Sequence, residues 1–112
     1  MRYAVPISNG KLAAHFGHCE HFAVIDVDDA TGAILQKQLL APPQHEPGVL
    51  PMWLAEEGVA TVIAGGMGSR AQAIFTENRI RVVIGAPEID PEQIVLAHVR
   101  GMLTTGENVC DH

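Results

Sequence analysis

Apolar and polar residues change their spacing several times along the chain, and each change marks a predicted element. Residues 2–8 ("RYAVPIS") are apolar enough for a first strand, and their proline favours an edge strand or a strand end. Residues 22–28 alternate between apolar and polar side chains, and after a turn residues 33–41 supply an antiparallel partner. A polar, glycine-containing connection joins the first strand to this hairpin.

The rest of the chain alternates between helical and strand patterns. Residues 49–58 place apolar side chains at helical spacing, and the segment ends at a glycine. Residues 59–66 and 81–86 are continuous apolar runs, which are typical of strands covered on both faces. The pattern therefore predicts two more strands, each preceded by a helix.

Two helices are indicated by the residues at their N-termini. Ser69 and Gln72 stand in the positions of a capping box, so a helix is expected from Ser69 on. Asp90, Pro91 and Gln93 fit the N-cap, the first helical position and the box partner of a last helix. The order β-β-β-α-β-α-β-α predicts an α/β fold, with a five-stranded mixed sheet and helices on both of its faces.

Composition limits the classes of function. The chain has 112 residues, of which 47% are hydrophobic, and this suits one domain over residues 1–112. We expect no membrane span, because no apolar run approaches about 18 residues, and a cytoplasmic location, because no signal peptide is evident. The two cysteines are expected to be thiols, and the net charge of -6 without a Lys/Arg cluster excludes a nucleic-acid partner.

The segment "HFGHCEHF" (residues 15–22) concentrates metal-binding side chains. In a helical turn, His15, His18 and Cys19 would share one face, whereas in an extended segment His15, Cys19 and His21 would share a side. Imidazole and thiolate groups ligate zinc, copper and iron. The spacing matches no zinc-finger pattern, however, and a solvated polar loop explains the segment equally well.

Other candidate ligands lie farther along the chain. Cys110 and His112 form a C-x-H at the C-terminus, where a tail with soft donors could close over a site, unless it is simply a disordered end. His45 lies in the loop "PPQHEPG", where most histidines are only solvated. His98 borders the apolar face of the last helix, and we interpret it as a packing residue.

The glycine loop "GGMGSRA" follows a buried strand and opens a helix, where backbone N–H groups and the helix dipole bind anions. Its candidate cofactor-binding residues are Gly65, Gly66, Met67, Gly68, Ser69 and Arg70. The loop also fits the dinucleotide pattern G-x-G-x-x-A, and a tight turn that brings helix and sheet close together explains it equally well. No catalytic constellation is evident, so the sequence indicates a binding protein and not an enzyme.

The chain resembles the dinitrogenase iron–molybdenum cofactor-binding family in four segments: "HFG", "PPQHEPGVLPMWLAEEGV", "VIAGGMGSRAQAIFTENRIRVVIGA" and "GENVCDH". The family consists of small accessory proteins that hold iron–molybdenum cofactor or its precursors, and some relatives carry other molybdenum-containing clusters. The resemblance implies a ribonuclease H-like, three-layer α/β/α sandwich. The family pattern covers His15, Phe16, Gly17, His45, Gly65, Gly66, Gly68, Arg70, Gly85, Cys110 and His112.

The resemblance also implies a function. It indicates a non-catalytic carrier of iron–molybdenum cofactor, its precursor or another molybdenum-, iron- or copper-sulfur cluster, with donor and acceptor proteins as partners. His18, Cys19 and His21 depart from the family pattern and leave the cargo open. A nucleotide-binding or regulatory module and a zinc-binding protein stay as alternatives, and we expect a monomer or a weak homodimer. The carrier hypothesis requires that His15 and His45 meet the glycine loop in the folded molecule.

Overall fold

The computed structural model describes residues 1–16, 19–43 and 49–106. None of the helices in these ranges is long and apolar enough to cross a membrane. The elements, in chain order, are β1 (Arg2–Ser8), β2 (Lys11–Leu12), β3 (His21–Val27), β4 (Ile34–Leu40), α1 (Val49–Glu56), β5 (Thr61–Ile63), α2 (Ser69–Glu77), β6 (Arg81–Val83) and α3 (Pro91–Val99).

One mixed sheet has the order β4-β3-β1-β5-β6, with the two-residue β2 paired to β1. β3 is antiparallel to β1 and to β4, whereas β5 and β6 continue the sheet in parallel with β1. This is the ribonuclease H-like arrangement, so the predicted five-stranded mixed sheet is confirmed. The sequence pattern missed only β2, which lies inside the predicted polar connection.

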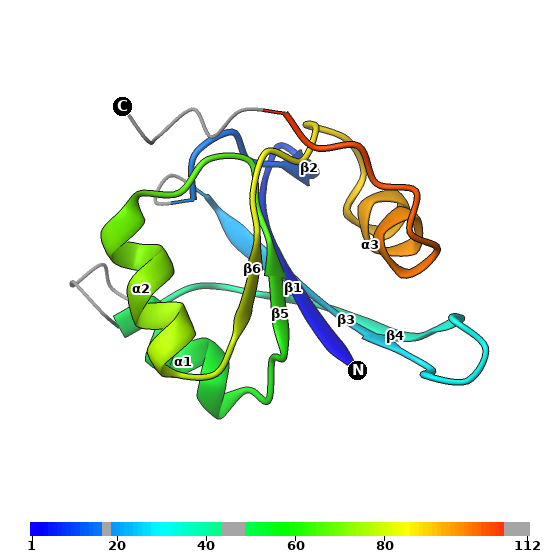
Figure 1. Ribbon diagram of the computed structural model, residues 1–112, viewed down its shortest axis with the longest axis horizontal. Coiled ribbons are helices and arrows are strands. Elements are labelled where there is room, and N and C mark those ends of the chain that lie inside the picture. The colour runs from blue at the N-terminus through cyan, green and yellow to red at the C-terminus, as the bar shows by residue number, and fades with distance from the viewer. Residues whose placement is uncertain (17–18, 44–48, 107–112) are drawn as a thin grey trace.

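The three helices cover both faces of the sheet. α1 and α2 lie on one face and α3 lies on the other, as Figure 1 shows with the sheet nearly edge-on. The alternation along β1 sets the two cores: Tyr3, Val5 and Ile7 join the cluster under α3, and Ala4 joins the cluster under α1 and α2. The α/β/α sandwich is therefore confirmed.

β1 is a central strand, so the interpretation of Pro6 as an edge-strand residue is wrong. Pro6 is not at the end of β1 either, because it pairs with Phe22 of β3, but the last pair between β1 and β5 is Ala4 with Val62 and Pro6 lies beyond it. Because β5 does not pair with β1 at this position, the missing N–H of Pro6 leaves no hydrogen bond to β5 unmade. The carbonyl of Pro6 accepts from the N–H of Ala13 at 2.8 Å.

The helix starts agree with the sequence, but one cap differs. α2 begins at Ser69 as predicted, yet its N-cap is Gly68 and no side chain caps it. The predicted capping box is wrong, because Ser69 is already the first helical residue and Gln72 donates its side-chain N–H to the carbonyl of Met67 at 2.9 Å. At α3 the predicted cap is confirmed, since Asp90 accepts from the N–H of Glu92 at 2.8 Å.

The strand directions bring several connections to one edge of the sheet. β1, β4, β5 and β6 run the same way, and Pro6, Phe22 and Leu40 are aligned across β1, β3 and β4. The connections that follow these four strands therefore all start at the edge where the strands end, which we call the carboxyl edge. Ligand sites in open α/β sheets form at this edge.

Candidate functional site

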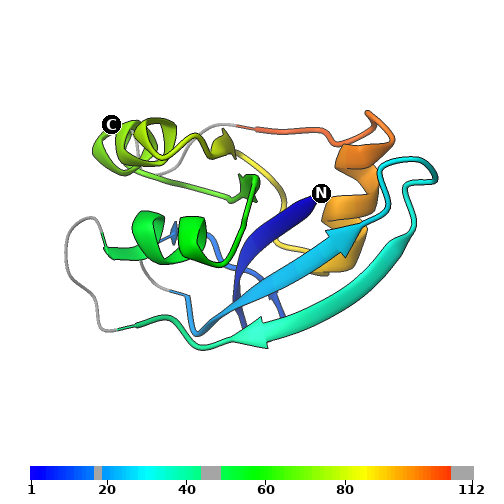
Figure 2. The ribbon, with the colours of Figure 1, turned by 90° about the horizontal axis from the view of Figure 1, so that it is seen from below.

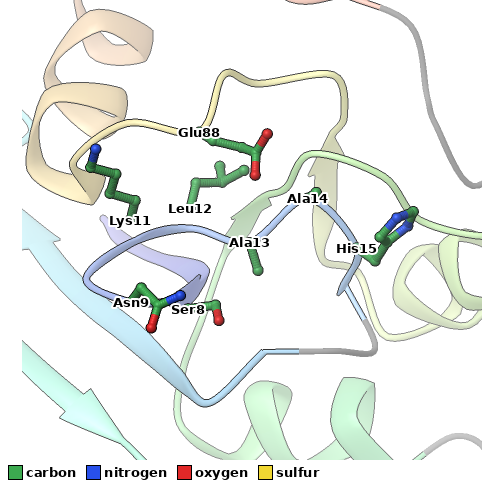
Figure 3. Close-up of a pocket in the computed structure, with 8 residues that line it drawn as sticks. All are labelled: Ser8, Asn9, Lys11, Leu12, Ala13, Ala14, His15 and Glu88. Atoms are coloured by element: carbon green, nitrogen blue, oxygen red, sulfur yellow. The ribbon is translucent and has the colours of Figure 1, made fainter.

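The segment after β1 lies directly against the glycine loop after β5. His15 forms an isolated parallel bridge with Gly66. The N–H of Phe16 donates to the carbonyl of Gly66, and the N–H of Gly66 donates to the carbonyl of Ala14, both at 2.8 Å. In Figure 3 the imidazole of His15 lies beside the loop that leads into α2. The expectation that His15 meets the glycine loop is thus confirmed.

Phe16 anchors this segment in the core. Its ring is 7% exposed and makes edge-on contacts with the rings of Phe75 in α2 and Phe22 in β3, at centroid distances of 5.3 and 5.7 Å. Such aromatic pairs stabilise beyond the area they bury. Because Phe16 is held on the α1/α2 side of the sheet, the preceding His15 stays exposed at the carboxyl edge.

Gly65 is needed for this close approach. A Cβ atom at Gly65 would meet the carbonyl oxygens of Ala14 and Ala13 at 2.9 and 3.1 Å, and Leu12 Cδ2 at 3.2 Å. The N–H of Gly66 is already donated to Ala14, so it does not point toward a ligand. The tight-turn interpretation therefore accounts for Gly65, and the bonded N–H of Gly66 argues against a dinucleotide fingerprint.

Gly68, Ser69 and Arg70 form the exposed part of the loop. They stand at the N-terminus of the nine-residue α2, where the helix dipole favours negative charge. A Cβ atom at Gly68 would meet nothing within 4 Å, so this side of the loop is open. Within the described part of the chain Arg70 has no ion-pair partner. An anion could therefore approach here.

A hollow lies beside His15. Its volume of about 350 Å³ is near the lower limit for small-ligand pockets. Figure 3 shows it between the connection after β1 and the loop after β6, with Lys11 and His15 at its two ends and Glu88 on the opposite wall. The sequence pattern did not single out Lys11 or Glu88. The topology could have done so for Glu88, which follows β6 at the carboxyl edge.

Cys19 and His21 lie on opposite faces of the sheet. Cys19 packs against the α1/α2 cluster, and burial raises the pKa of its thiol from 9.0 to about 11. His21 pairs with Ile7, whose side chain belongs to the α3 cluster, so His21 is on the α3 side. The extended side that the spacing suggested therefore does not gather Cys19 and His21, whereas the helical-turn alternative includes His18, which lies outside the described residues.

No group of three His, Cys, Asp or Glu side chains that could hold a metal is present in residues 1–16, 19–43 and 49–106. His18, His45, Cys110 and His112 fall outside the described residues, as does Gly17. Of the seven predicted ligands, the structure thus describes His15, Cys19 and His21, and only His15 adjoins the glycine loop.

The C-terminal segment also reaches the glycine loop. The N–H of Gly106 donates to the carbonyl of Gly85 at 2.7 Å, and the N–H of Gly85 donates to that of Gly65 at 2.6 Å. Gly85 has a φ of +78°, and a Cβ atom there would overlap the backbone of Gly106. Four chain segments, at Ala14, Gly65, Gly85 and Gly106, are therefore linked by backbone hydrogen bonds.

His98 lies far along α3 and packs as expected. Its ring contacts Tyr3 edge-on at a centroid distance of 5.6 Å. Burial and the nearby charge of Arg81 lower the pKa of His98 from 6.5. It takes no part in the carboxyl-edge site.

Comparison with known proteins adds to this geometry. Residues 1–101 match the family described as dinitrogenase iron-molybdenum cofactor. An uncharacterized protein of Methanocaldococcus jannaschii is 31% identical in an alignment over 87 residues that covers 73% of this chain and 72% of that protein. The crystal structure of PH0822 has a TM-score of 0.85 and 26% identity, over 96% of both chains. The apo form of the orange protein from Desulfovibrio gigas shares the fold, with a TM-score of 0.71 and 23% identity over 96% of this chain and 93% of that one.

Proposed function

Because the chain belongs to the dinitrogenase iron-molybdenum cofactor family, we propose that it is a non-catalytic carrier of a metal–sulfur cluster. Its cargo would be iron–molybdenum cofactor, a precursor of it or a related molybdenum-, iron- or copper-sulfur cluster, received from a donor protein and passed to an acceptor. One observation carries the proposal: the His15 segment, the glycine loop and the C-terminal segment meet at the carboxyl edge.

Metal–sulfur clusters of this kind are anionic, so their sulfides call for positive charge and hydrogen-bond donors. The N-terminus of α2, Arg70 and Lys11 offer these around the edge. His15 offers an exposed imidazole for an open metal position. The protein as a whole has a net charge of -6, which repels an anionic cargo, so these local positive groups must outweigh that repulsion.

Further ligands would come from chain segments that lead into the edge. Cys110 follows Gly106 by four residues in the sequence, and His45 belongs to the connection that starts after Leu40 of β4. A carrier has to release its cargo, and a small number of ligands on separate segments favours release over a closed four-ligand site. We therefore assign His15, His45, Cys110 and His112 to the cluster.

Two alternatives have less support. A zinc site within "HFGHCEH" that used both Cys19 and His21 would need side chains that lie on opposite faces of the sheet. A dinucleotide site would need the N–H of Gly66 for phosphate, and that group is bonded to Ala14. Stoichiometric zinc that is lost in Cys19→Ala but kept in Arg70→Ala would favour the first alternative over the carrier.

The carrier proposal is tested with anaerobically purified native protein, by elemental analysis and a visible spectrum. We expect molybdenum, iron or copper together with visible absorption. Most of the metal and of the absorption should be lost in His15→Ala, in Arg70→Ala and in a protein lacking residues 107–112. Arg100→Ala is the matched control, because Arg100 is an exposed arginine next to the C-terminus of α3 and outside the site. Cluster retention that is equal in all four proteins would overturn the proposal.

A further inference from the structure

β4 is an edge strand with little protection along its centre, because its β-bulge lies near one end, where Val27 of β3 pairs with Ile34. Figure 2 shows it along the margin of the molecule, on the side of β3 away from β1. Its seven residues include no proline, and Leu35 and Leu39 are 65% and 56% exposed. Its lysine, Lys37, already pairs with Glu92 of α3 at 3.3 Å. Natural proteins usually block such edges with charge, proline or a covering segment.

The backbone groups on the outer side of β4 can be assigned from the ladder. Met1 and Val27 exchange two hydrogen bonds, so the odd-numbered residues of β3 direct their N–H and C=O groups toward β1 and the even-numbered ones toward β4. The β4 partners of these even-numbered residues are Gln36, Gln38 and Leu40.

Lys37 and Leu39 consequently direct their N–H and C=O groups outward, away from β3. Within the described residues, no backbone hydrogen bond is made on this side of β4. Two outward donors and two outward acceptors are thus available at the centre of the strand.

We infer that β4 is the interface with a second copy of this chain, and that the two β4 strands pair antiparallel about Gln38. In this register Lys37 of each copy faces Leu39 of the other, and each such pair exchanges two hydrogen bonds. The stem of Lys37 covers the exposed side chain of Leu39 while its ammonium group stays with Glu92. The two Gln38 amides meet on the opposite face of the sheet.

The neighbouring registers fit less well. Pairing about Lys37 would set the two Lys37 side chains directly opposite each other, and like charges in that position are destabilising. Pairing about Leu39 would move the strands toward Pro42 and Pro43, which have no N–H to donate. Only the register about Gln38 uses the outward groups of Lys37 and Leu39 together and avoids both faults.

The pairing joins the two sheets into one, but it buries only one strand edge from each copy. Such an area lies at the small end of protein interfaces, so we expect a weak dimer that depends on concentration. Because the strands are antiparallel, the two carboxyl edges point in opposite directions. The inference therefore does not rest on the proposed function, and either can fail without the other.

The first test is sedimentation of the full chain from about 10 μM to about 1 mM, a range over which weak interfaces dissociate. The mass should rise from 12.0 kDa toward twice that value. Amide hydrogen exchange at Lys37 and Leu39 should slow over the same range, whereas the amides of Gln36, Gln38 and Leu40 stay protected throughout. A constant mass with rapid exchange at Lys37 and Leu39 would overturn the inference.

The second test reverses the charge at one exposed position. In Leu39→Lys, the new lysine of each copy faces Lys37 of the other, so the dissociation constant of the dimer should rise about tenfold. In Leu39→Glu, the new carboxylate faces Lys37 instead, so the dissociation constant should fall several-fold. Both variants remove the same apolar side chain, so opposite effects cannot come from lost hydrophobicity. Met102→Lys, at a 74% exposed residue outside β4, should change nothing. Equal effects of the two Leu39 variants would place the interface elsewhere and refute the inference.

Discussion

Replacing Gly65 by alanine would separate the two segments that form the candidate site. The added Cβ atom would lie 2.9 Å from the carbonyl oxygen of Ala14 and 3.1 Å from that of Ala13. Both neighbours are backbone atoms, and neither can rotate away as the end of a side chain could. The segment that carries His15 must therefore move outward.

The expected cost follows from these contacts. Overpacking at a buried position costs about 1–3 kcal/mol. Moving the segment also strains the two 2.8 Å hydrogen bonds of Gly66 with Ala14 and Phe16, each of which contributes about 1 kcal/mol. We expect Gly65→Ala to lower the free energy of unfolding by about 2–4 kcal/mol in total. With a urea m-value of about 2 kcal/mol per molar, the unfolding midpoint should fall by about 1–2 M.

Gly68→Ala is the matched control in the same loop. Gly68 has a φ of -64° and open space around its Cβ position, so alanine fits without strain and the midpoint should stay within about 0.3 M of the wild type. Two-dimensional NMR would show whether the His15 resonances shift in Gly65→Ala and stay in place in Gly68→Ala. Equal midpoints for Gly65→Ala and the wild type would refute the close packing of Gly65 against Ala13 and Ala14.

Three further predictions concern charge and protonation. Because burial raises the pKa of Cys19 to about 11, alkylation of Cys19 at pH 9 in a Cys110→Ser protein should be much slower than in the same protein unfolded in urea; equal rates would contradict the burial. The pKa of His98 is lowered, so below pH 6.5 the unfolded chain takes up a proton that the folded chain resists, and stability should fall as the pH drops; His98→Gln should show a shallower loss in urea titrations at each pH. Glu88→Gln removes a negative charge from the hollow beside His15 and should tighten retention of an anionic cluster about threefold at low salt, an effect that salt should weaken.

Local pattern was enough for most of the fold. The helix start at Pro91 follows from its cap residue Asp90, and the buried strands follow from continuous apolar runs; the start at Ser69 was predicted correctly although its capping box does not form. Pro6 shows where such reasoning stops: its place in a central strand depends on where β5 ends, and that is decided by tertiary pairing. The cap at Gly68 differs by one residue from the predicted one, which is within the usual uncertainty of helix ends.

The candidate site was less accessible to sequence reasoning. The spacing of Cys19 and His21 suggested a shared side, but the chain between them enters β3, and the pairing of His21 with Ile7 fixes its face. The meeting of His15 with Gly66 joins residues about fifty positions apart, and periodicity carries no information on such a contact. The sequence showed the glycines that allow this close contact, but it did not show which segment they contact.

The platform that presents the site is assembled from main-chain atoms. Backbone N–H and C=O groups link Ala14 to Gly66, Gly65 to Gly85 and Gly85 to Gly106, and glycine is required only where two stretches of backbone touch. Side chains around the rim are not needed to hold the four segments together. Ligands can therefore be exchanged one at a time without refolding the scaffold, which gives a single architecture the means to be adapted to cargoes of different metal composition.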